Sequence, residues 1–89
     1  MKNYIIVEQH ITDFGWESEI IANYKTEELA RLDLSARIEA LINCDPHIAI
    51  RDLNPFNHSI LVRTGWLHSS GLSYPMGQFL IVNLNRLDS

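Results

Sequence analysis

The chain has 89 residues, enough for one domain, and its 46% hydrophobic and 20% charged residues are typical of a folded globule rather than a disordered segment. A formal net charge of −4 without any cluster of Lys or Arg argues against nucleic-acid binding through phosphate contacts. No apolar run approaches the ~20 residues of a membrane span, and the N-terminus lacks a signal-peptide pattern. We therefore expect a cytoplasmic protein that does not enter a membrane, which the single cysteine, Cys44, also favours.

The first 24 residues predict an antiparallel hairpin of two strands. Residues 3–11 and residues 16–24 both alternate between apolar and polar side chains, and both are rich in residues that favour strands. The intervening Thr12-Asp13-Phe14-Gly15 is a turn signal. We expect Trp16, next to this turn, to complete the hydrophobic core.

Residues 26–43 predict the main helix. Thr26 can accept a hydrogen bond from an unpaired backbone N–H of the first turn, and Glu27 and Glu28 suit the positive end of the helix dipole. At the other end, Asn43 can adopt a left-handed cap, and Pro46 prevents a further turn. Cys44, just beyond, is expected to be a small buried hydrophobic residue.

At about 100° per residue, the apolar residues of this helix form two stripes instead of one. The first stripe consists of Ala30, Leu34, Ile38, Leu41 and Ile42. The second, on roughly the opposite side, consists of Leu29, Leu32, Ala36 and Ala40. A helix on a sheet needs only one stripe, so the second predicts a contact with a second copy or a partner. A wider helix–sheet contact with scattered exposed leucines is the alternative.

The rest of the chain predicts three more strands, at residues 47–53, 58–64 and 78–86. The last strand is apolar on both faces, which indicates a central position in the sheet. The resulting fold is a single α+β domain over residues 1–89, with one helix on one face of a mostly antiparallel sheet of four to five strands, in the order ββαβββ. We expect the uncovered face of the sheet to carry apolar side chains, namely Tyr4, Ile6, Leu61, Phe79 and Ile81.

The connection at residues 65–77 is unusually long for a compact domain, and such loops are often functional. Several of its residues belong to types that are enriched at interfaces. The candidates for partner binding are Trp66, Leu67, His68, Leu72, Tyr74 and Met76. A loop that folds back and packs its own side chains is the alternative.

No catalytic motif accompanies these features, so we expect neither enzymatic activity nor a metal or other cofactor. The four histidines, His10, His47, His58 and His68, lack the spacing of a metal motif on a helix, and Cys44 has no partner in a CxxC motif. The serines lack a GxSxG motif, and the four glycines are spread over turns instead of forming a phosphate loop.

The first half of the chain resembles small phage-encoded proteins that include host-takeover factors and anti-CRISPR inhibitors. The matching segments are Tyr4-Ile5-Ile6-Val7-Glu8, Trp16 to Tyr24, and Thr26-Glu27-Glu28 with Ala30. The resemblance implies a short, acidic, non-catalytic domain that occludes a surface on a larger machine in the host cytoplasm. It assigns no functional residue, because that group of proteins shares no common site.

The main hypothesis is therefore a non-enzymatic protein-binding module, either a homodimer or an inhibitor of a host complex. One alternative is a small metal- or histidine-dependent enzyme, which would require the histidines to converge in space. The other is a regulatory nucleic-acid-binding protein that uses Arg51, Arg63 and Arg86 of the slightly basic second half.

Overall fold

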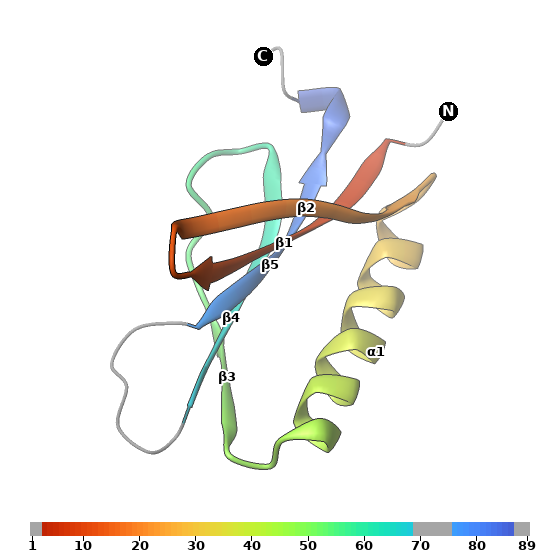
Figure 1. The fold of residues 1–89 in the computed structure, drawn as a ribbon. Helices are drawn as coiled ribbons and strands as arrows, with labels where there is room; N and C mark the ends of the chain where they lie inside the picture. Colours follow the sequence, from red (N-terminus) through yellow and green to blue (C-terminus); the bar gives the residue numbers. More distant parts are fainter. Residues whose placement is uncertain (1–2, 69–75, 87–89) are drawn as a thin grey trace.

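The computed structural model describes residues 3–68 and 76–86. Its elements are β1 (Tyr4–Thr12), β2 (Gly15–Tyr24), α1 (Glu27–Cys44), β3 (Ile48–Asp52), β4 (Ile60–His68), β5 (Gly77–Asn83) and the short 3-10 helix η1 (Leu84–Arg86). The five strands form one sheet in the order β2-β1-β5-β4-β3, each pair antiparallel, and α1 lies on one face (Figure 1). The predicted α+β fold and its order are confirmed.

The helix begins where the sequence predicts. The side chain of Thr26 accepts a hydrogen bond from the backbone N–H of Leu29 at 3.3 Å, which satisfies one unpaired donor of the first turn. The predicted cap at Asn43 is wrong, because α1 continues through Cys44 and the backbone N–H of Asp45 donates to the Leu41 carbonyl. Cys44 is exposed rather than buried, because the first stripe already fills the space beneath the helix.

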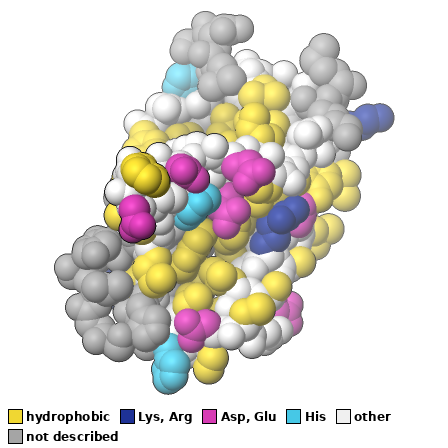
Figure 2. Space-filling model, viewed as in Figure 1, with side chains coloured by type: hydrophobic (Ala, Val, Ile, Leu, Met, Phe, Trp, Pro, Cys, Tyr) yellow, Lys and Arg dark blue, Asp and Glu magenta, His cyan; other side chains and the backbone are white. Residues whose placement is uncertain are grey.

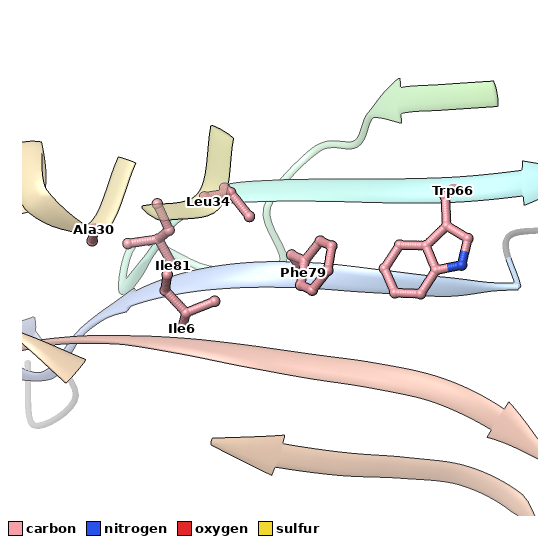
Figure 3. Close-up of a cluster of buried hydrophobic side chains, with 6 residues drawn as sticks. All are labelled: Ile6, Ala30, Leu34, Trp66, Phe79 and Ile81. Atoms are coloured by element: carbon pink, nitrogen blue, oxygen red, sulfur yellow. The ribbon is translucent and has the colours of Figure 1, made fainter. Parts of the chain in front are cut away.

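The main core lies between α1 and the face of the sheet that it covers, here called the helix face. Ala30 and Leu34 of α1 point toward the sheet, and Trp66 lies beside Phe79 farther along (Figure 3). The six buried residues of this core are Ile6, Ala30, Leu34, Trp66, Phe79 and Ile81. The assignment of Tyr4, Ile6, Leu61, Phe79 and Ile81 to the uncovered face is wrong, since all five belong to or pack against this core.

The opposite side of the sheet, here called the open face, carries a second apolar cluster. Ile60, Leu80 and Val82 are buried there, and Ile5, Val7 and Leu84 pack against them. Since β5 has apolar residues on both faces and occupies the centre of the sheet, its predicted central position is confirmed. In β1 and β5, strand periodicity predicts which residues share a face, but two apolar faces leave open which one meets the helix.

A β-bulge in β2 changes which of its side chains point to each face of the sheet. The register against β1 shifts between Ile6 and Val7, so that Ala22 lies opposite Ile6 while Ile20 lies opposite Val7. Because of this extra residue, residues 16–20, before the bulge, and residues 22–24, after it, cannot follow one strict alternation between the two faces. Trp16 therefore lies on the open face and is 53% exposed, and the expectation that it completes the core is wrong.

Candidate functional site: an apolar groove beside the helix

The second stripe of α1 is exposed, which both a partner contact and scattered exposed leucines allow. Leu32 is 68% exposed, and Leu29, Ala36 and Ala40 are exposed as well. The first stripe supplies the buried Ala30 and Leu34 and the partly buried Ile38 and Leu41. The helix thus has one apolar side against the sheet and another that the described residues leave uncovered.

The exposed stripe leads into a groove between α1 and the β1–β2 hairpin. The groove has a volume of about 310 Å³, and its lining residues are Glu8, Ile21, Arg37, Ala40, Leu41, Cys44 and Phe79. Ala40 belongs both to this lining and to the exposed stripe, so the two apolar surfaces are continuous. The lining is mostly apolar and open to one side, which suits an apolar side chain of a partner.

A polar cluster fixes the helix against the end of β2 next to this groove. The hydroxyl of Tyr24 donates a hydrogen bond to the carboxylate of Asp33, and Arg37 Nε lies 2.9 Å from Asp33 Oδ1. The hydrogen bond to Asp33 raises the pKa of Tyr24, and desolvation and the negative charge of Asp33 act in the same direction. This cluster sets the position of α1 relative to the hairpin, and hence the position of the groove.

Acidic side chains border the groove on the hairpin. Glu8 of β1 lies directly opposite Glu19 of β2 in the strand register. His10 lies opposite Glu17, with 3.6 Å between His10 Nε2 and Glu17 Oε2. These residues share the helix face beyond the part of the sheet that α1 covers. Figure 2 shows hydrophobic side chains gathered between the hairpin and the helix, with acidic side chains around them. The surface is therefore apolar at its centre and negative along the hairpin, while Arg37 on the helix side is paired with Asp33.

The residues predicted for partner binding in the connection 65–77 have different positions. Trp66 and Leu67 belong to β4 and are buried, and the Trp66 ring centroid lies 4.8 Å from that of Phe79. Met76 is partly buried, and its backbone N–H donates to the Trp66 carbonyl at 2.7 Å. His68 ends β4, and its side chain lies outside the described part of the chain, as do Leu72 and Tyr74. Trp66 and Leu67 are thus core residues, and a binding role for the loop stays a prediction.

Sequence reasoning missed much of the groove lining. Ile21 reaches the groove because of the bulge in β2, and Glu8 and Glu19 come together through the register of the hairpin. Neither the bulge nor the register has a distinct signal in the sequence, since the turn at residues 12–15 is compatible with several registers.

Within residues 3–68 and 76–86, no three His, Cys, Asp or Glu side chains gather in a way that could hold a metal ion. Among the same residues, no helix is both long and apolar enough to cross a membrane. The chain matches no protein-family model, no curated protein and no solved structure.

Proposed function

We propose that this protein is a non-enzymatic protein-binding module whose contact surface is the groove together with the exposed stripe of α1. The observation that carries the proposal is the continuity of the two through Ala40. Large exposed apolar patches are rare on monomeric proteins, and those with a polar border mark interaction sites. The area is built by residues of α1 and of the three strands β1, β2 and β5.

The chemistry of the surface selects a basic partner segment. Glu8, Glu17 and Glu19 lie beside the apolar groove, so Lys or Arg side chains flanking an apolar anchor would complement it. The apolar anchor provides most of the affinity, while the charges increase the association rate and exclude acidic partners. We therefore propose an amphipathic segment with basic residues at its edges.

A second copy of the chain fits this surface less well. Two-fold pairing of the same patch would place acidic borders near each other, and like charges across an interface destabilise it. The homodimer expected from the sequence stays a prediction, which light scattering during size-exclusion chromatography measures directly. A monomer at micromolar concentration is the result that this proposal expects.

The resemblance of the first half to phage-encoded inhibitors supports a further part of the proposal. In this part of the proposal, the basic segment belongs to a larger host complex. The small acidic domain inhibits that complex by covering the segment, in the manner of anti-CRISPR and host-takeover proteins. Such an inhibitor needs no catalytic group, only a surface that its target recognises.

The test compares substitutions of two apolar residues that are both more than half exposed. Leu32 is 68% exposed on the proposed surface, and Ile20 is 60% exposed on the open face. Tagged wild type, Leu32→Gln and Ile20→Gln are used to capture proteins from a lysate of the host cell. We expect wild type and Ile20→Gln to retain the same partner and Leu32→Gln to lose it. Equal capture by all three proteins would contradict the proposal.

A further inference from the structure

The open face of the sheet carries a row of hydrogen-bonded polar side chains that runs across four strands. Gln9 donates to Ser18 Oγ at 3.0 Å, Gln78 donates to Gln9, and Arg63 Nε donates to Gln78 Oε1 at 2.8 Å. The row continues to the connection after β3, because Arg63 Nη1 donates to the Asn54 carbonyl at 3.0 Å. Polar side chains in the middle of a sheet face are held in fixed orientations by such a chain of bonds.

A cleft of about 340 Å³ lies over this row, with an aromatic ring on each side. Its lining residues are Gln9, Trp16, Phe56, Arg63 and Gln78. Trp16 is 53% exposed and Phe56 is 60% exposed, so both rings are accessible. The guanidinium carbon of Arg63 lies 4.0 Å from the centre of the Phe56 ring, so Arg63 covers one face of this ring.

The charges of the protein are separated between the two faces of the sheet. On the open face, the strand register places Arg63 beside Leu80 and Arg51 in the same row as Gln78, with Gly65 between them. None of the described strand residues on that face is acidic, whereas Glu8, Glu17 and Glu19 lie on the helix face. The net charge of the chain is a sum over both faces, so it does not describe the charge of the surface around the cleft.

We infer that this cleft binds single-stranded nucleic acid. The exposed rings of Trp16 on β2 and Phe56 after β3 provide stacking platforms for unpaired bases. The amides of the polar row provide hydrogen-bond partners for base edges, and the arginines attract phosphates. The carboxylates on the helix face oppose this binding only weakly, because charges more than about 8 Å apart are largely screened at physiological ionic strength. This activity is independent of the protein-binding surface beside α1.

The number of phosphate contacts sets the salt dependence. Two arginines predict that the logarithm of the association constant falls with the logarithm of salt concentration with a slope of about −1.4, since each contact to a single strand contributes about −0.7. This slope is small, so the stacking on Trp16 and Phe56 has to provide most of the affinity. A duplex, whose bases are already stacked on each other, should bind much more weakly.

The experiment is a fluorescence-anisotropy titration of a labelled single strand of about 12 nucleotides with the full chain, at several salt concentrations. We expect binding with the slope given above. Arg51→Gln should reduce the slope to about −0.7, because the inference assigns one of the two phosphate contacts to the exposed Arg51. Trp16→Ala should weaken binding by about 5- to 150-fold and leave the slope unchanged. Leu32→Gln, on the other side of the molecule, should bind as wild type does.

A second measurement uses the difference between the two tryptophans. Trp16 is exposed and Trp66 is buried, so a base that stacks on Trp16 should quench the fluorescence of the wild type but not of Trp16→Phe, in which only Trp66 remains. The inference is overturned if the strand does not bind at low salt, or if duplex or an aspartate peptide of equal charge binds equally well. It is also overturned if neither Arg51→Gln nor Trp16→Ala changes the affinity.

Discussion

The indole ring of Trp66 lies over Gly77, its cross-strand partner in β5. A Cβ atom added at Gly77 would lie only 2.2 Å from Trp66 Cζ2, far closer than carbon atoms can approach. The missing side chain of Gly77 is therefore what allows Trp66 to pack against Phe79 inside the main core. This pair ties the end of β4 to the centre of the sheet.

Gly77→Ala should accordingly destabilise the protein. We expect a loss of about 1–3 kcal/mol in the free energy of unfolding, because overpacking forces the ring and the strands apart. Urea denaturation followed by circular dichroism measures it. In the Trp66→Leu background the clash is removed, so there the same glycine substitution should cost less. An equal cost in both backgrounds would show that the indole is not the cause.

The two sides of α1 should differ sharply in their effect on stability. Leu34→Ala should lower the free energy of unfolding by about 2–5 kcal/mol, because Leu34 is buried in the main core. Leu32→Ala should change it by less than about 0.5 kcal/mol, since Leu32 is exposed and Ala is the better helix former. Thermal and urea denaturation of both variants test this. A large cost for Leu32→Ala would place the second stripe in the core of the chain.

The start of the helix depends on one side chain. Thr26→Ala removes the acceptor for the Leu29 backbone N–H and should cost about 1 kcal/mol. Thr26→Asp should retain the stability, because a carboxylate also accepts this bond and suits the helix dipole. Denaturation midpoints of the two variants measure the difference. If Thr26→Ala were as stable as wild type, the cap would make no net contribution.

The bond between Tyr24 and Asp33 should make stability depend on pH in the alkaline range. The pKa of Tyr24 is raised in the folded state, so the folded protein favours the protonated phenol. The stabilisation is therefore fully present below the unfolded pKa of about 10, and it is lost as the pH rises through the raised folded pKa. Wild type should lose stability over that range more than Tyr24→Phe does. Parallel curves for the two proteins would contradict this.

The fold was predictable from local patterns, while the surfaces that depend on the sheet were not. The alternation of residues 3–11, the cap at Thr26 and the two-sided apolar strand at residues 78–86 give the order of elements and the central place of β5. These signals depend on neighbouring residues only. They leave open which face of the sheet meets α1, since both faces of β5 are apolar.

The candidate sites depend on register and on long-range pairing instead. The sequence pattern places Trp66 in a loop, and only the pairing of β4 with β5 shows that it lies over Gly77. Likewise, the bulge that moves Trp16 to the open face is an irregularity without a local sequence signal. The exposed stripe of α1 was predictable, because helix periodicity alone separates Leu32 from Leu34.

The central claim is that the groove and the exposed stripe bind a basic amphipathic segment, and a peptide titration tests it most directly. A labelled helical peptide of Leu and Lys, and its Leu and Glu counterpart, are titrated with wild type, Leu32→Gln, Glu19→Gln and Ile20→Gln. We expect wild type to bind only the basic peptide, with a loss of about 10- to 100-fold in Leu32→Gln, a few-fold loss in Glu19→Gln and none in Ile20→Gln. Equal binding of both peptides, or equal losses in Leu32→Gln and Ile20→Gln, would contradict the claim.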